Sequence, residues 1–277
     1  MIDTHCHLDF PVFDHDRALI LKQAQGYGFE SIIVPAVVQK DWPRVIDLCE
    51  RNNLITLNFA LGLHPCFMNQ HASVDEAEVA LNEAIVRSMI GVKNSEKEGD
   101  AVETIGGRLV AVGEIGLDYF IDSPEGNRQK QLALFSMQLS VAKKHNLPVL
   151  LHVRKAHDEV LKCLRRERLE KGGIVHAFSG SEQQASQYCE LGFVLGIGGS
   201  ATYDRAKKLA RIIRQTSVES LVLETDAPDI PPAFARGERN TPLNLPRIAQ
   251  AIAEIRGMDA AVFIQQTSIN AKRVLGL

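Results

Sequence analysis

The sequence predicts an α/β protein of the TIM, or (β/α)8, barrel class. Short apolar runs alternate with amphipathic stretches along all 277 residues. Several runs consist almost entirely of Val, Ile and Leu, as in IIVPAVV, PVLLHV and LVLETD, which is typical of parallel strands that are buried on both faces. Eight strands, each followed by a helix over about 250 residues, are the pattern of this barrel. A doubly wound open sheet shows the same alternation, so the strand count alone leaves both architectures open.

The predicted strands and helices follow one another in a regular order. The strands are expected over residues 1–5, 31–38, 56–63, 108–115, 148–153, 173–177, 193–197 and 221–225. Ser73 with Glu76 and Ser181 with Gln184 form capping boxes, which predict where two of the intervening helices begin. The longest helix is expected over residues 128–146.

No Pro- or Ser-rich linker divides the chain, so one domain over residues 1–277 is predicted. The polar, glycine-containing stretch 93–107 is expected to be an exposed insertion before the fourth strand. With 45% hydrophobic and 23% charged residues, the composition is that of an ordinary globular protein. The net charge of −3 argues against a broad basic surface for a long nucleic acid. A local phosphate site stays possible, because a bound metal ion adds positive charge that the count omits.

The cysteines and the N-terminus indicate the cellular compartment. The five cysteines are scattered and include no Cys-x-x-Cys pair, so free thiols in a reducing compartment are expected. MIDTHCHLDF has neither a basic start nor an apolar run, and no stretch approaches the ~18 apolar residues of a membrane span. A soluble, cytoplasmic protein is therefore predicted. A monomer is expected because no excess of apolar residues is visible.

Polar side chains recur at one place in the predicted strands, namely at or just past their C-terminal ends. They are His5, His7, His64, Glu114, His152, His176 and Asp226. In a (β/α)8 barrel these strand ends converge on the face that carries the active site. Seven residues scattered through the chain would thereby share one pocket.

Each of these residues also has an ordinary structural explanation when it is taken alone. His5 and His7 lie two apart on a strand, so both point to the same face, and a hydrogen-bonded pair explains them as well as a metal ion does. Glu114 ends an apolar strand and could pair with an arginine instead of a metal. His152 and His176 could each be a hydrogen-bonded core histidine.

Taken together, these side chains favour a metal centre. Asp226 could cap a helix, but Pro228, two residues later, makes that role less natural. Four imidazoles and two carboxylates are enough for two divalent ions about 3.5–4 Å apart, with Glu114 between them. Mixed nitrogen and oxygen ligands suit Zn, Mn, Fe and similar ions without choosing among them.

Six motifs span nearly the whole chain in a fixed order. They are DTHCHLD, GLHP, VGEIGLDY, a Gln-rich helix before NLPVLLHVR, HAFSGS and LVLETDAPD. In sequence and order they resemble the TatD-type metal-dependent hydrolases, in the YjjV-like branch of that family. The resemblance implies a TIM barrel of the metal-dependent hydrolase type with two divalent ions, which could be Mg, Mn or Zn. It places His5, His7, Glu114 and Asp226 on one ion, and Glu114, His152 and His176 on the other.

The resemblance also implies an activity. Characterised family members are deoxyribonucleases, which often act on single strands from the 3′ end with Mg or Mn. A 3′-5′ exonuclease with single-stranded DNA or another phosphodiester as substrate is therefore expected. Glu114 and Asp226 would be the catalytic residues, with Asp226 binding one ion and taking a proton from the attacking water. His64 occupies the position of a substrate-side histidine in the family.

Other residues could contact a substrate at the same mouth. Arg154, two residues after His152 on one strand, is expected to hold phosphate together with His64, although it could instead be a surface residue paired with Asp158 or Glu159. Arg205 lies where barrels often bind phosphate, but an exposed helix face explains it better. Asp118 and Tyr119 are expected to brace the loop after Glu114 rather than to touch substrate.

Three other functions compete with a nuclease. A carboxylic-ester or amide hydrolase, acting for example on an aminoacyl ester or a lactone, could use the same two-metal site. A binding or scaffolding protein with a degenerate site is disfavoured by the intact ligand set. Gly196, Gly198 and Ala201 spell G-x-G-x-x-A, which resembles a dinucleotide fingerprint. A dinucleotide site would leave the His, Asp and Glu residues at the strand ends unexplained. The glycines are therefore expected to let their loop approach the barrel mouth closely.

Overall fold

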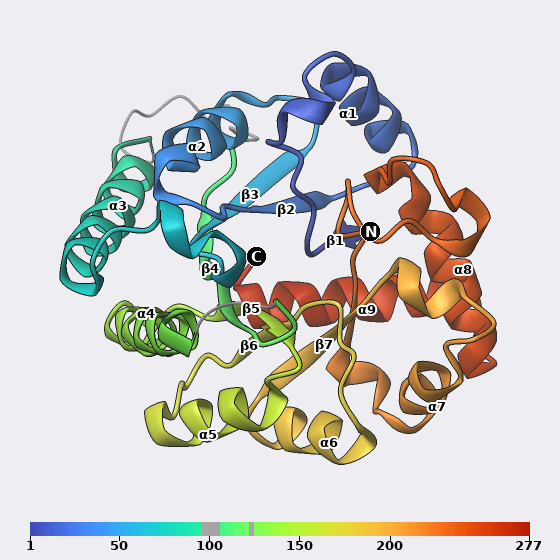
Figure 1. Cartoon of the computed structure of the whole chain (residues 1–277). Helices are drawn as coiled ribbons and strands as arrows, with labels where there is room; N and C mark the ends of the chain where they lie inside the picture. Colours follow the sequence, from blue (N-terminus) through green and yellow to red (C-terminus); the bar gives the residue numbers. More distant parts are fainter. Residues whose placement is uncertain (96–105, 122–124) are drawn as a thin grey trace.

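Eight parallel strands form one sheet in chain order in the computed structural model, which describes residues 1–95, 106–121 and 125–277 (Figure 1). The strands are β1 (Ile2–Asp3), β2 (Ser31–Pro35), β3 (Thr56–Leu61), β4 (Leu109–Asp118), β5 (Val149–Arg154), β6 (Gly173–Val175), β7 (Phe193–Ile197) and β8 (Leu221–Leu223). A helix lies between most consecutive strands and brings the chain back across the sheet, so neighbouring strands run parallel.

Helices surround the sheet, as Figure 1 shows. They are α1 (Arg17–Gly26), α2 (Trp42–Arg51), α3 (Val74–Ser95), α4 (Glu125–Lys144), α5 (His157–Glu167), α6 (Glu182–Glu190), α7 (Lys207–Gln215), α8 (Leu245–Arg256) and α9 (Ala260–Leu275). Both expected capping boxes are present: Ser73 and Glu76 bond reciprocally ahead of α3, and Ser181 and Gln184 do so at α6. No helix among the described residues is both long and apolar enough to cross a membrane.

The first and last strands meet, which closes the sheet into a barrel. The Thr4 amide donates to the Leu223 carbonyl at 3.0 Å, and the Asp226 amide donates to the His5 carbonyl at 2.8 Å. An open doubly wound sheet has two unpaired edges and is therefore excluded. The TIM barrel predicted from the sequence is confirmed.

Strand ends differ from the predicted ones in a consistent way. β1, β2, β3, β6 and β8 end two or more residues early, because the apolar runs continue into buried segments at the barrel mouth that no longer pair as strands. β4 is longer than predicted and runs on to Asp118, so Glu114 lies inside a strand instead of at its end. The pairing of β4 with β5 shifts register between Val112 and Ile115. Glu114 lies within this shifted stretch.

The expected insertion at 93–107 is only partly correct. Helix α3 continues to Ser95, and residues 96–105 lie outside the described part of the chain. At the end of the stretch, Gly107 is buried, and a Cβ there would lie 1.4 Å from the Leu57 carbonyl oxygen.

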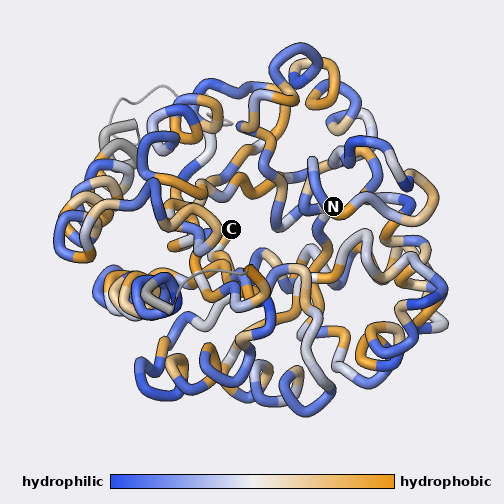
Figure 2. Tube along the Cα trace, viewed as in Figure 1, coloured by the Kyte–Doolittle hydropathy of each residue, from blue (hydrophilic) through white to orange (hydrophobic). Residues whose placement is uncertain are grey.

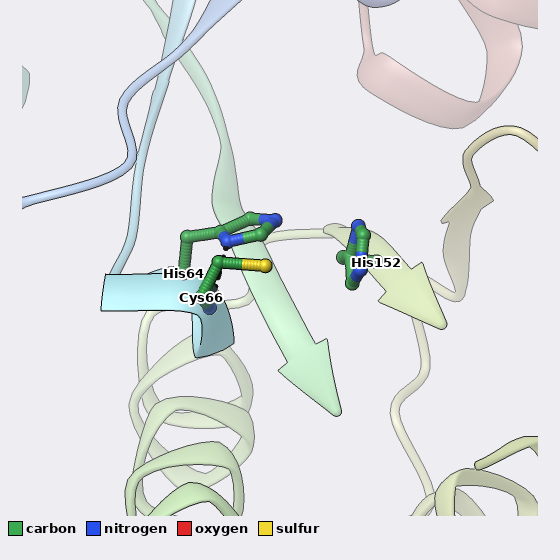
Figure 3. Close-up of side chains that lie close together, drawn as sticks. All are labelled: His64, Cys66 and His152. Carbon is green, nitrogen blue, oxygen red and sulfur yellow. Dashed lines mark hydrogen bonds between the residues drawn. The ribbon is translucent and has the colours of Figure 1, made fainter. Parts of the chain in front are cut away.

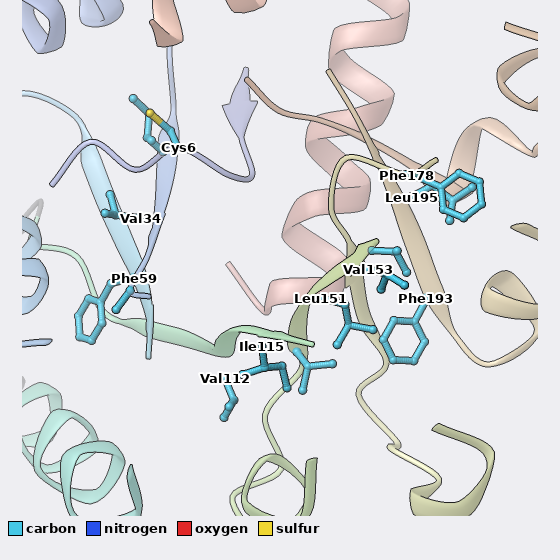
Figure 4. Packing of buried hydrophobic residues seen from close by; sticks show 14 of the residues in the cluster. Cys6, Val34, Phe59, Val112, Ile115, Leu151, Val153, Phe178, Phe193 and Leu195 are labelled. Atoms are coloured by element: carbon cyan, nitrogen blue, oxygen red, sulfur yellow. The ribbon is translucent and has the colours of Figure 1, made fainter. Parts of the chain in front are cut away.

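Two apolar clusters hold the barrel together. The larger one packs the outer faces of the strands against the helices, and Figure 4 shows part of it around Val112, Ile115 and Leu151. The smaller one fills the N-terminal end of the barrel, where Ala271, Val274 and Leu275 of α9 close it. In Figure 2 the strands are mostly hydrophobic, whereas the helices alternate between hydrophobic and hydrophilic residues. With that end filled, the polar groups are left at the opposite, C-terminal mouth.

Candidate metal centre

Glu114 lies at the middle of the barrel mouth with histidines around both of its carboxylate oxygens. Its side chain is buried, and Oε2 lies 3.2 Å from His5 Nε2 and 3.4 Å from His7 Nε2. Oε1 lies 3.1 Å from His152 Nδ1 and 3.2 Å from His176 Nε2. The two oxygens of the Glu114 carboxylate therefore face two different groups of imidazoles.

The group around Oε2 includes a second carboxylate. Asp226 Oδ1 lies 3.7 Å from His5 Nε2 and 3.8 Å from His7 Nε2, and the two Nε2 atoms are 3.3 Å apart. Ligand atoms that surround one zinc ion tetrahedrally at about 2.0–2.1 Å are themselves roughly 3.4 Å apart. The atoms of His5, His7 and Glu114 have this spacing and suit one divalent cation, and Asp226 Oδ1 lies a few tenths of an ångström farther from the two imidazoles.

Acceptor oxygens lie near the outer nitrogens of three histidines. His7 Nδ1 lies 3.2 Å from the Pro35 carbonyl oxygen, and His152 Nε2 lies 3.0 Å from Asp118 Oδ2. His176 Nδ1 lies 3.4 Å from Glu224 Oε1 but makes no hydrogen bond within the described residues. The carbonyl behind His7 and the carboxylate behind His152 are acceptors, so a neutral ring with its proton on the outer nitrogen would leave the nitrogen that faces Glu114 free for a cation.

The carboxylates beside these rings determine the electrostatics of the centre. Burial alone would lower the pKa of His7, but the hydrogen bond and charge of Glu114 raise that pKa to about 9. For His176, the carboxylates of Asp226 and Glu114 likewise outweigh burial and raise the pKa well above its usual value. Without a cation, protons must fill the space between nitrogen and carboxylate. A divalent ion replaces such protons, so the residues fit a bound metal.

His64 differs from the other histidines in its hydrogen bonding. Its Nδ1 accepts from the Cys66 amide at 3.0 Å, so the neutral ring carries its proton on Nε2, which lies 3.1 Å from Glu114 Oε1. Burial lowers the pKa of His64 to about 4, which keeps the ring neutral. His64 therefore offers an N–H to the pocket where the ligand candidates offer a lone pair.

Figure 3 shows His64 and Cys66, at the start of η3 (Pro65–Gln70), facing His152 on β5. The three could form a metal cluster by proximity, but two features oppose it. The protonated Nε2 of His64 cannot accept, and burial with the nearby Asp118 carboxylate raises the pKa of the Cys66 thiol to about 12. The trio is better explained as the wall of the pocket.

Two carboxylates that support the ligands carry no metal-site signal in the sequence. Asp118 accepts from the Phe120 and Ile121 amides through Oδ1 and from His152 through Oδ2, so it braces the loop, as expected, and orients a ligand. Glu224 is fully buried, and its Oε1 accepts from the Ala177 amide.

The glycines of the G-x-G-x-x-A stretch make room for Glu224. A Cβ at Gly196 would lie 2.1 Å from Glu224 Oε2, and one at Gly198 would lie 2.7 Å from the Glu224 carbonyl oxygen. The segment leads into the short 3-10 helix η4 (Gly199–Thr202). Close approach at the mouth, as expected, accounts for these glycines.

The centre opens into a pocket of ≈ 530 Å³. His7, His64, Glu114, His152, His176 and Asp226 all line it, whereas His5 is completely buried behind them. Arg154 also lines this pocket; its guanidinium lies 3.7 Å over the Phe120 ring, with no carboxylate partner among the described residues. Arg205 is exposed, stacks over Tyr203 and does not line the pocket. The structure thus brings every predicted ligand and both predicted phosphate contacts to one place.

Comparison with known proteins identifies relatives over the full chain. The family model described as TatD related DNase matches residues 2–276. The uncharacterized metal-dependent hydrolase YjjV of Escherichia coli K12 is 40% identical over 255 residues, which cover 92% of this chain and 90% of that protein. Human deoxyribonuclease TATDN3 is 29% identical over 277 residues, with 99% and 94% covered. The crystal structure of YjjV, a TatD homolog, superposes with a TM-score of 0.87 at 37% identity and covers 100% of this chain and 98% of that one.

Proposed function

This chain belongs to the TatD family of metal-dependent hydrolases, and we propose that it is a deoxyribonuclease that removes nucleotides from the 3′ end of single-stranded DNA. The observation that carries the proposal is the position of Glu114, whose two carboxylate oxygens face two separate groups of ligands. His5, His7, Glu114 and Asp226 would hold one divalent ion. Glu114, His152 and His176 would hold the other. The nuclease character is supported by the family description and by the name of the human relative.

The residues of the chain divide the work of phosphodiester hydrolysis. Bound divalent ions lower the pKa of water and neutralise phosphate oxygens. Asp226 takes the proton from the attacking water, because its carboxylate lines the pocket and an ionised carboxylate can act as a general base. His64, through its Nε2–H, and Arg154, through its guanidinium N–H groups, would donate hydrogen bonds to the phosphate.

Backbone geometry holds Asp226 in place for this role. It adopts a left-handed conformation with φ 57°, which is costly for a residue other than glycine. Its amide donates to the His5 carbonyl, and its carbonyl accepts from the Asp229 amide. Nearby, buried Asn240 donates to the Thr225 and Asp229 carbonyls. The loop is therefore fixed on both sides of the carboxylate.

The test is digestion of a single-stranded oligonucleotide labelled at the 5′ or the 3′ end, with Mg, Mn or Zn supplied in turn. We expect a 5′-labelled ladder that shortens with time and early release of the 3′ label as a mononucleotide. Asp226→Asn keeps a ligand oxygen but cannot take the proton, so its kcat should fall by about 10²–10⁴ while metal content is retained.

Two results would contradict the proposal. Near wild-type hydrolysis by Asp226→Asn removes this residue from proton transfer. No cleavage with any metal, by protein shown to hold two ions, excludes the nuclease. In that case, turnover of aminoacyl esters or lactones would identify the ester or amide hydrolase that the same centre allows.

A further inference from the structure

A second pocket, of ≈ 730 Å³, opens beside the metal centre and shares Arg154 and Ser179 with the first one. Loops after β4, β5 and β6 form its walls, together with the beginnings of α5 and α6. Arg154 lies at the junction, between the candidate phosphate position and the second pocket. A nucleic-acid strand that extends from the metal centre past Arg154 would enter this pocket.

Cationic side chains line the second pocket. Lys155 directly follows Arg154 and is exposed, and Lys208, at the start of α7, reaches the pocket edge, where its Nζ donates to the Ser179 carbonyl at 3.1 Å. Neither lysine pairs with a carboxylate among the residues that the structure describes. In a chain with a net charge of −3, three cations around one cavity favour an anionic ligand.

Two acidic residues also line the pocket, but each has a partner. Asp158 accepts from Gln184 Nε2 at 2.8 Å, and Glu159 lies 3.2 Å from Lys162 Nζ. Both lie in the first turn of α5, where the helix dipole stabilises negative charge. Their charges are thus partly compensated before any ligand binds.

A buried imidazole nitrogen in the pocket wall has no partner. His157 lines the pocket and is 8% exposed; its Nδ1 lies 3.2 Å from Tyr188 Oη, whereas Nε2 bonds to nothing in the described part of the chain. His157 is also the first residue of α5, whose N-cap Ala156 has no side chain to satisfy the first amides. Backbone amides at a helix start without a capping side chain suit an anion.

We propose that this second pocket is a phosphate subsite that binds the phosphodiester next to the scissile bond of single-stranded DNA. Arg154, Lys155 and Lys208 supply the charge, and the start of α5 supplies neutral donors. The inference rests on the proposed nuclease function and deepens it. It makes an oligonucleotide a better substrate than a small diester, because only the oligonucleotide reaches both pockets.

The test compares two substrates on lysine variants. Lys155→Ala and Lys208→Ala should each raise KM for a single-stranded oligonucleotide about three- to tenfold. Each should also reduce the slope of log KM against log salt by about 0.7, the value for one phosphate contact on a single strand. Turnover of bis(4-nitrophenyl) phosphate, which fits the metal-centre pocket alone, should stay within twofold of wild type. Lys22→Ala, on the exposed side of α1, makes the same charge change elsewhere and should alter neither substrate.

The outcomes separate the subsite from the nuclease itself. If the oligonucleotide KM of both variants equals that of Lys22→Ala, or both substrates lose turnover equally, the subsite is wrong. If wild type hydrolyses neither substrate, the nuclease proposal fails, and the subsite is then judged by equilibrium binding of a labelled oligonucleotide in EDTA. Weaker binding by the two variants alone would support an anion subsite, and unchanged binding would exclude it.

Discussion

The hydrogen-bond partner of the outer ring nitrogen determines the role of each of these histidines at the barrel mouth. His7 and His152 have an acceptor oxygen behind the ring, so the inner nitrogen is free to bind a cation. His64 has a backbone amide behind it and therefore turns an N–H inward. Residue type and strand position group all three together in the sequence. The partner of the outer nitrogen separates the ligands from the substrate-side residue.

Glu224 is the buried carboxylate whose effect on the centre is easiest to measure. Its Oε1 lies 3.4 Å from His176 Nδ1, and a carboxylate in that position orients a metal-binding imidazole and raises its basicity. Glu224→Gln keeps the shape but removes the charge. We expect the affinity for Mn or Zn to fall about 10–100-fold, measured by competition with a chromophoric chelator.

The matched control for Glu224 is Glu219→Gln, the same chemical change at an exposed carboxylate earlier in the chain. It should leave metal affinity unchanged. Equal affinities for the wild type and Glu224→Gln would show that Glu224 does not support His176.

In β4 and in the segments that follow β2, β3 and β8, the strand ends differ from those that the sequence pattern predicts. Apolar runs predict buried backbone, and the residues after β2, β3 and β8 are buried, yet they no longer pair as strands. In β4 the opposite occurs, because glycine allows pairing to continue: a Cβ at Gly116, with φ 148°, would lie 1.9 Å from the His152 carbonyl oxygen. Burial could be predicted from the sequence, but strand ends depend on contacts between distant segments.

Helix α9 closes the end of the barrel opposite the metal centre. Leu275 is 5% exposed and packs in the smaller apolar cluster. Leu275→Ala removes buried methyl groups and leaves a cavity, so the free energy of unfolding should fall by about 2–4 kcal/mol. Activity per folded molecule should not change, because the cluster lies far from the mouth. Urea denaturation and specific activity measure the two effects.

Val262→Ala is the control for the Leu275 variant, because Val262 is 53% exposed on the same helix. It should change stability by no more than about 0.5 kcal/mol. A Leu275→Ala protein as stable as this control would mean that α9 does not close the barrel.

At the scale of the whole molecule, the barrel explains why a chain-wide set of residues forms one centre. Its eight strand ends converge, so His5 and Asp226 meet although 220 residues separate them. The fold and the six candidate ligands could be predicted from strand position and residue type. Glu224, the Cys66 amide and the second pocket could not, because their roles depend on atoms that only the folded chain brings together.

Metal content of the purified chain tests the two-ion centre most directly. After reconstitution with Mn or Zn and removal of excess metal, mass spectrometry of the ions should give two per wild-type chain. Glu114→Ala removes the carboxylate that faces both ligand groups, so its content should fall below one. A wild-type chain that holds one ion or none, or a Glu114→Ala chain that still holds two, would contradict a centre built on Glu114.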